Sequence, residues 1–260
     1  MKITSTLVFL IGFSLSATCQ SWKIISAYSL GLPRGEMTDN IQPAHSLQAG
    51  VLYQLPGTLK HLSVGTELGI GVYASKRIDQ TFQLNGNEPS VVPVNYNSNV
   101  FNVNLQARWD FMGKDSYVNP YLQAKGGMYN FFSNITVEDP DDPNGCHALQ
   151  HQNIINDNTL YWSAGGGLQV NTGLFAKTKH MSGVMIDISV NTIRGGDISY
   201  INTKKLLDAQ DASGPGGKPL NVEFINVSTQ EIHEHTVAQL YTTPLRMMEF
   251  RAGVVVALGK

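Results

Sequence analysis

The sequence predicts an all-β protein whose strands form an eight-stranded antiparallel up-and-down transmembrane β-barrel. Three observations favour this fold. Eight segments alternate apolar and polar residues, which gives a β-strand one face of each kind. Several of these segments have about ten residues, the length of strand that crosses a bilayer. The connections between them alternate between long and short, as they do in barrels whose long loops all lie on one side of the membrane.

The clearest strand spans residues 101–111, FNVNLQARWDF, in which every second residue is apolar. Its apolar face begins with Phe101 and ends with Phe111. Aromatic residues at both ends of an apolar face are typical of strands that meet both membrane–water interfaces. We expect such an interface belt, rather than ligand binding, for Phe101, Trp109, Phe111, Phe131, Trp162 and Phe250.

The other strands are predicted from the same alternation, with proline, glycine and asparagine marking the turns between them. In chain order the eight strands are expected at residues 22–32, 46–53, 61–73, 101–111, 121–131, 159–170, 184–191 and 245–258. Long connections follow the first, third, fifth and seventh strands, and short ones follow the rest. With the N-terminus in the periplasm, every long connection would lie outside the cell.

The last long connection, residues 194–243, is too long to be without structure. Residues 203–209 could form a short helix, and residues 220–227 and 232–240 could form a hairpin. In the membrane this hairpin would make a ten-stranded barrel. Its polar and charged residues fall on both faces, and a charge that faces lipid costs about 2–4 kcal/mol. We therefore expect a hairpin that stands above the membrane.

The N-terminus has the layout of a secretory signal peptide, predicted at residues 1–19. Lys2 precedes a short apolar run at residues 7–13, and small and polar residues follow. The barrel would then occupy residues 20–260. In an alternative reading, Cys19 carries a lipid. If Cys19 is removed with the signal, Cys146 is the only cysteine left, and no internal disulfide can form.

This strand pattern resembles that of the small outer-membrane β-barrel proteins of Gram-negative bacteria, such as the transmembrane domain of OmpA. The resemblance covers nearly all of the mature chain and rests on pattern rather than on a fingerprint. It implies the cell outer membrane as the location and outer-membrane lipid as a contact. The chain departs from many such barrels at residues 257–260, ALGK, which lack a terminal aromatic residue.

Seven charged residues lie on the polar faces of the predicted strands and are expected to form a charge network in the lumen. They are Glu67, Arg108, Asp110, Lys125, Asp187, Glu249 and Arg251. An eight-stranded barrel has little more room than its side chains fill, and mixed charges can pair there. The set favours a salt-bridged plug, with Glu67, Arg108 and Lys125 at similar height. The alternative is a narrow polar conduit, with space left by the inward glycines Gly65, Gly69, Gly71, Gly165 and Gly167.

Other polar clusters carry weaker signals, and no metal or cofactor is expected. The acidic run 138–145, EDPDDPNG, fits no complete calcium loop and is expected to be a solvated loop. Cys146, His147 and His151, like His233 and His235, show no standard zinc spacing. His233, Glu234 and His235 supply a base and an acid, but no motif ties a serine to them, so we do not expect an enzyme.

These features favour a non-enzymatic outer-membrane protein, either structural or binding a partner protein or surface ligand through its extracellular loops. Residues 194–243 are the main candidate, because loops on a rigid scaffold commonly carry binding functions. The alternative is a passive channel for small polar or amphipathic solutes. The formal charge of −2 and the lack of a basic stripe argue against a nucleic-acid partner.

Overall fold

The computed structural model describes residues 21–85, 88–113, 116–138, 148–172, 181–204, 217–225 and 232–258. Within them, nine strands form one antiparallel sheet. The strands are β1 (Ser21–Pro33), β2 (Ala44–Gln54), β3 (Leu62–Asn85), β4 (Glu88–Asp110), β5 (Val118–Glu138), β6 (Ala148–Asn171), β7 (Met181–Ile201), β8 (Lys218–Ile225) and β9 (Ile232–Leu258). Helix α2 (Met37–Asn40) lies between β1 and β2, and the short 3-10 helix η1 (Gly57–Leu59) lies between β2 and β3. No helix of the described residues is long and apolar enough to cross a membrane.

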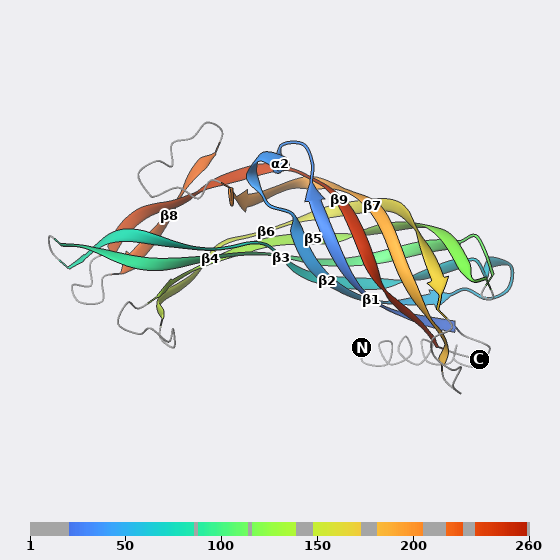
Figure 1. Cartoon of the computed structure of the whole chain (residues 1–260). Helices are drawn as coiled ribbons and strands as arrows, with labels where there is room; N and C mark the ends of the chain where they lie inside the picture. Colours follow the sequence, from blue (N-terminus) through green and yellow to red (C-terminus); the bar gives the residue numbers. More distant parts are fainter. Residues whose placement is uncertain are drawn as a thin grey trace, which may run out of the picture.

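Eight of the nine strands close into a barrel (Figure 1). Strands β1 to β7 pair in chain order, β7 pairs with β9, and β9 returns to β1 with Leu258 opposite Trp22. Strand β8 pairs with β9, from Lys218 opposite Leu240 onwards, and lies outside the closed ring. The predicted eight-stranded barrel is therefore confirmed, and the late hairpin adds no strands to its wall.

The barrel has two different ends, which we name the terminal end and the cap end. The terminal end holds the start of β1, the end of β9 and the short connection at residues 55–61. The cap end holds α2 and the hairpins β3–β4, β5–β6 and β8–β9. These hairpins extend well beyond the barrel in Figure 1.

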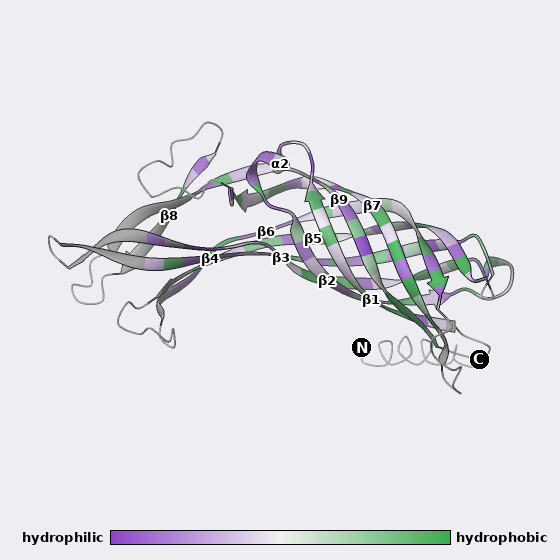
Figure 2. Cartoon of the chain, viewed as in Figure 1, coloured by the Kyte–Doolittle hydropathy of each residue, from purple (hydrophilic) through white to green (hydrophobic). Residues whose placement is uncertain are grey.

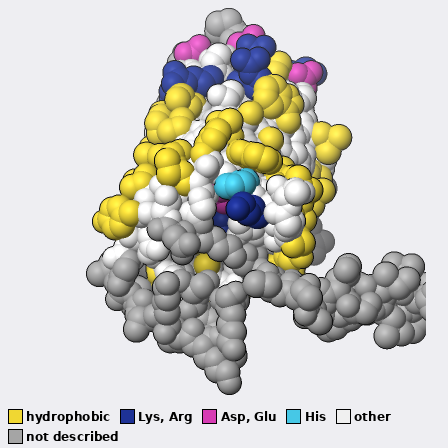
Figure 3. All heavy atoms as spheres, turned by 90° about the vertical axis from the view of Figure 1, so that its right-hand side faces the viewer, with side chains coloured by type: hydrophobic (Ala, Val, Ile, Leu, Met, Phe, Trp, Pro, Cys, Tyr) yellow, Lys and Arg dark blue, Asp and Glu magenta, His cyan; other side chains and the backbone are white. Residues whose placement is uncertain are grey.

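The outer wall of the barrel is apolar and the inner wall is largely polar. Outward leucines such as Leu47, Leu105 and Leu160 are 67%, 69% and 78% exposed. The colours alternate along the barrel strands in Figure 2, and Figure 3 shows the hydrophobic side chains gathered in a broad band. A water-soluble protein rarely exposes so much contiguous apolar surface. The wall is therefore suited to lipid on the outside, as in transmembrane barrels.

The aromatic belt is only partly as predicted, because Phe131 points into the barrel. Trp109, Phe111, Trp162 and Phe250 face outward and are exposed, whereas Phe131 is fully buried. Phe131 shares a strand face with Lys125, since residues an even number apart in a strand point to the same side. The expectation that Phe131 belongs to the outer belt is therefore wrong.

The strands toward the cap end are longer than the sequence predicts. Residues 76–99, expected as a loop, form most of the β3–β4 hairpin, with Lys76 opposite Tyr96. Strand β7 continues to Ile201, and β8 and the start of β9 also lie within residues 194–243. These parts are outside the apolar band, so they lack the regular apolar face by which the barrel strands were identified. The helix considered at residues 203–209 lies mostly outside the described residues.

Other atoms occupy the space beside the inward glycines, mostly backbone of the neighbouring strand and, at Gly69, the Asn102 side chain. A Cβ atom on Gly65 would lie 1.9 Å from the carbonyl oxygen of Val51, and one on Gly165 would lie 2.1 Å from that of Val190. Real Cβ atoms do not approach so closely. These glycines allow adjacent strands to come together in a narrow barrel.

Replacing Gly65 with alanine is therefore expected to destabilise the barrel by about 1–3 kcal/mol or more, because the added methyl group meets fixed backbone. Gly126→Ala is the matched control: Gly126 lies on the outer face of β5, and the nearest atom to its added Cβ would be 4.0 Å away. Urea unfolding in detergent, followed by tryptophan fluorescence, measures both variants. Equal stability of the two variants would contradict the proposed close approach at Gly65.

Candidate functional site

Eight charged side chains are buried inside the barrel, and their formal charges cancel. All seven predicted lumen residues are among them, each no more than 6% exposed. The eighth is Lys23 of β1, a residue that is not among the predicted lumen charges. Four acids therefore face four bases: Glu67, Asp110, Asp187 and Glu249 against Lys23, Arg108, Lys125 and Arg251. Buried charges are tolerated when they are paired in this way.

The first of two charged clusters lies toward the terminal end and is centred on Arg108. Its Nε atom is 3.0 Å from Asp110 Oδ1, and its Nη1 atom is 3.4 Å from Asp187 Oδ1. Lys23 Nζ lies 2.6 Å from the other oxygen of Asp110. Tyr121 donates its hydroxyl to Asp187 at 3.0 Å, and its ring centre lies 3.3 Å from the guanidinium carbon of Arg108. Each carboxylate thus has partners from different strands.

The second cluster lies in the middle of the barrel and is centred on Glu67. Lys125 Nζ is 2.6 Å from one of its oxygens, and Arg251 Nη2 is 2.7 Å from the other. Lys125 also lies 3.7 Å from Glu249. Polar side chains complete the coordination of Glu249: Gln48 donates at 2.6 Å, Asn191 at 2.8 Å and Ser29 at 3.1 Å. The cluster thus ties five strands, β1, β2, β3, β7 and β9, to β5.

Strand register explains why Glu67, Arg108 and Lys125 do not all meet at one height. Ser63, four residues before Glu67, is opposite Arg108, while Asn104 is opposite Glu67. Arg108 is therefore closer to the terminal end and joins Asp110 and Asp187. Of the three residues expected at similar height, Glu67 and Lys125 meet, whereas Arg108 lies closer to the terminal end. Lys23 could have been found from its even spacing to the inward residues Ala27 and Ser29.

An apolar layer covers the charged clusters on the side of the cap end. Its rings come from β3, β5 and β6, and the Phe131 ring centre is 5.2 Å from that of Tyr73 and 5.5 Å from that of Tyr129. Tyr161 meets Tyr129 edge to face at 5.4 Å. Met37 and Ile41, from the β1–β2 connection, pack into the same layer and are fully buried. Side chains therefore close the lumen above the charges.

Helix α2 is fixed over the barrel mouth by Asn40. The Asn40 carbonyl accepts the backbone N–H of Thr203 at 2.9 Å, and its side-chain oxygen accepts from Asn202 at 3.2 Å. Its amide donates to the Tyr200 hydroxyl at 3.4 Å, which also lies 2.9 Å from the Thr243 hydroxyl. Burial raises the pKa of the Tyr200 phenol, so this hydroxyl keeps its proton. Polar contacts and burial of Met37 and Ile41 together hold α2 in place.

Beyond the barrel, the strands form a second folded unit, which we name the cap (residues 74–85, 88–99, 132–138, 148–160, 196–204, 217–225 and 232–243). The last β6–β7 pair is Tyr161 with Gly195, so beyond it the sheet separates into β3–β4–β5–β6 and β7–β9–β8. The two parts meet through buried apolar side chains. These are Val94, Tyr96, Ile135, Ile155, Ile201 and Ala238, with Ile154, Leu220 and Leu240 packed against them. The cap therefore has its own core.

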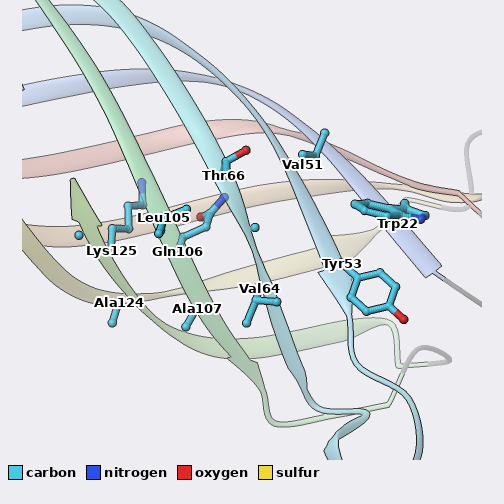
Figure 4. Close-up of a pocket in the computed structure, with 12 residues that line it drawn as sticks. Trp22, Val51, Tyr53, Val64, Thr66, Leu105, Gln106, Ala107, Ala124 and Lys125 are labelled. Atoms are coloured by element: carbon cyan, nitrogen blue, oxygen red, sulfur yellow. The ribbon is translucent and has the colours of Figure 1, made fainter. Parts of the chain in front are cut away.

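A groove of about 690 Å³ lies on the outer wall, across β3, β4 and β5. It passes over small residues, with Ala107 opposite Ala124, and the larger Trp22 and Tyr53 also line it (Figure 4). In that view Lys125 and Gln106 point to the other side of the sheet from these alanines. The groove therefore belongs to the lipid-facing surface and does not open into the charged lumen.

The other candidate residues form no site among the described side chains. His151 lies 2.9 Å from the Thr136 hydroxyl on the neighbouring strand. In the described part of the chain, no group of three or more His, Cys, Asp or Glu residues is arranged to hold a metal ion. Cys146, His147 and most of the acidic run 138–145 lie outside the described residues. So do the side chains of His233, Glu234 and His235.

No protein-family model matches the chain, and no curated protein matches it. Similar solved structures include Neisserial surface protein A, with 11% identity, 93% of this chain and 97% of that chain covered, and a TM-score of 0.38. The N-terminal β-barrel domain of Pseudomonas aeruginosa OprF has 14% identity, coverage of 91% and 96%, and a TM-score of 0.32. Ail, the attachment invasion locus protein of Yersinia pestis, has 10% identity, coverage of 92% and 97%, and a TM-score of 0.36.

The geometry of the chain itself defines its class. A closed ring of eight antiparallel strands, an apolar exterior and a charged, paired interior make it a transmembrane β-barrel. Likeness at these identities concerns the fold alone.

Proposed function

We propose that this protein is a closed, non-enzymatic barrel of the outer membrane that holds its cap at the cell surface for contact with a partner protein or surface ligand. In this arrangement the terminal end faces the periplasm, and residues 1–19 are the signal peptide that directs export. The cap is then the part of the molecule that meets the surroundings of the cell.

The observation that carries this proposal is the separate apolar core of the cap. Flexible loops on a barrel would need no such core, whereas Tyr96, Ile135 and Ile201 are fully buried where the two parts of the cap meet. A folded platform loses little conformational entropy when it binds, because its backbone is already ordered. The barrel below it supplies a rigid base, since its lumen is filled by paired charges and by the apolar layer.

A second candidate function, a passive path for small polar solutes, has one observation in its favour. Both polar side-chain atoms of Gln106 are buried on the inner face of β4 and have no hydrogen-bond partner among the described residues. Such a polar side chain is suited to hydration. Conductance separates the two functions: the refolded chain is expected to give no steady openings in a planar bilayer. Openings whose size changes in Glu67→Gln would instead make the lumen a pathway.

Contact through the cap is tested by photo-crosslinking in intact outer membranes. A photoreactive residue is placed at Asn153 on β6 or at Lys218 on β8, two exposed positions on different parts of the cap. Leu105, which is 69% exposed on the lipid-facing wall, is the control position. We expect a discrete protein or glycan adduct from at least one cap position and none from Leu105. Absence of adducts at both cap positions would contradict the proposal.

A further inference from the structure

Three arginines lie side by side at the cap end of the outer wall, one directly after β1 and the others on β9 and β7. Arg246 of β9 is directly opposite Arg194 of β7 in the strand register. On its other side, Arg34 donates its backbone N–H to the Arg246 carbonyl at 2.9 Å. All three residues are exposed, and each has even spacing to the outward-facing residues of its own or the adjoining strand. We name this set the arginine row.

Among the described residues, the arginine row forms no ion pair with an acidic side chain. The nearest acids along the chain, Glu36 and Asp197, are exposed and form no ion pair with it. The Arg34 side chain donates to the Met248 sulfur, with its Nη2 atom 3.2 Å away. Like charges directly opposite each other destabilise a pair of strands. An anion held between them would remove this cost.

The arginine row lies just beyond the apolar band. The next outward residues toward the terminal end are Leu32, Met248 and Thr192, which lie opposite one another on β1, β9 and β7. The exposed Phe250 and Val190 come two residues further on. Trp162, directly opposite Arg194 on β6, is 54% exposed. Outward tryptophans of this kind mark the level of lipid headgroups. Figure 3 shows Lys and Arg side chains gathered with some acidic ones at the upper edge of the hydrophobic band.

We propose that the arginine row binds the phosphate groups of lipid headgroups in the leaflet at the cap end. A guanidinium group presents two parallel N–H donors that match the oxygens of a phosphate. Neighbouring strands lie about 4.8 Å apart, so adjacent arginines can share one headgroup. This inference rests on the proposed membrane location and adds a lipid class to it. The bound lipid neutralises the row and fixes the height of the barrel in the membrane.

The test uses the tryptophan beside the row as its reporter. The chain has three tryptophans, and Trp22→Phe with Trp109→Phe leaves only Trp162. This chain is refolded into phosphatidylcholine vesicles that contain phosphatidic acid, with brominated acyl chains on one lipid or the other. Quenching of Trp162 then measures the preference for the phosphate monoester lipid. We expect a clear preference for phosphatidic acid, reduced roughly fivefold for each arginine changed to glutamine at Arg194 or Arg246.

Lys60→Gln is the matched control, because it removes one exposed positive charge at the terminal end. It should leave the preference unchanged. Equal quenching by both lipids in the chain that keeps all three arginines would overturn the proposal. So would a loss of the phosphatidic acid preference in Lys60→Gln as large as in the arginine variants. So would loss of the preference on adding inorganic phosphate, since the row would then take soluble phosphate. Failure of the chain to enter vesicles at all would instead contradict the membrane location.

A structural role for the row predicts a different result in neutral detergent. If the arginines mainly hold β7, β9 and β1 together, Arg246→Gln should unfold at lower urea concentration than the native chain. If the row needs an anion, the same change relieves repulsion and leaves the midpoint unchanged or higher. A lower midpoint together with an unchanged lipid preference would overturn the proposal.

Discussion

Glu67→Gln is expected to lower the free energy of unfolding of the barrel by about 3–5 kcal/mol, the usual cost of breaking a buried ion pair from one side. The change keeps the shape of the side chain. It removes the negative charge that Lys125 and Arg251 share at 2.6 Å and 2.7 Å. Two cations then remain with Glu249 as the nearest carboxylate. Urea unfolding in lipid vesicles measures the loss.

The double variant Glu67→Gln with Lys125→Gln is the control for this result. It leaves Arg251 with Glu249 and so restores the balance of charges in the cluster. We expect it to recover a substantial part of the lost stability, because the remaining cost is that of hydrogen bonds rather than of an unpaired charge. A loss below about 1 kcal/mol in the single variant would show that the lumen is well hydrated, which would favour the channel.

Phe131→Ala is expected to destabilise the barrel by about 3–5 kcal/mol, the range observed when a large aromatic residue is removed from a packed core. Phe131 is fully buried and its ring contacts those of Tyr73 and Tyr129. Truncation leaves a cavity between the apolar layer and the base of the cap, since the rings around it are held by their own strands. Urea unfolding of the refolded chain measures the effect.

Phe111→Ala is the natural comparison, because Phe111 is an aromatic residue of the same kind that is 55% exposed at the outer wall. Its removal opens no internal cavity, and we expect a loss under about 1 kcal/mol. A larger loss for Phe111→Ala than for Phe131→Ala would mean that the outer belt contributes more to stability than the inner layer does. That result would contradict the inward placement of Phe131.

The sequence predicts the barrel well where one strand face meets lipid. In residues 101–111 the apolar face is uninterrupted, so both the strand and its orientation follow from alternation alone. Lys23 has the same even spacing as the inward residues of β1, but it lies near the start of the strand, where alternation is hard to recognise. The inward direction of the eight buried charges thus follows largely from odd or even spacing along each strand. Their partners depend on the strand register, which the sequence pattern does not reveal.

The apolar layer and the cap could not be predicted in the same way. Aromatic residues commonly lie at strand ends, which favours the outer belt for Phe131. Phe131 is, however, six residues from the inward Lys125 on the same strand, and this even spacing places it on the inner face. The inner wall changes from polar to apolar near the cap end, and a simple rule of polar inside and apolar outside fails there. In the cap, strands with polar residues on their outer faces pair around a small core, so their pattern is that of an ordinary soluble sheet.

The contacts of Asn40 carry a consequence for the order in which the molecule assembles. Its partners Tyr200, Asn202 and Thr203 are separated from it by 160, 162 and 163 positions along the chain. Contacts between such distant segments form late, after the loop between them has been closed by other interactions. Strands β3 to β7 must therefore be in place before α2 has anything to bind. The mouth therefore cannot close before residues 200–203, at the end of β7, are in place.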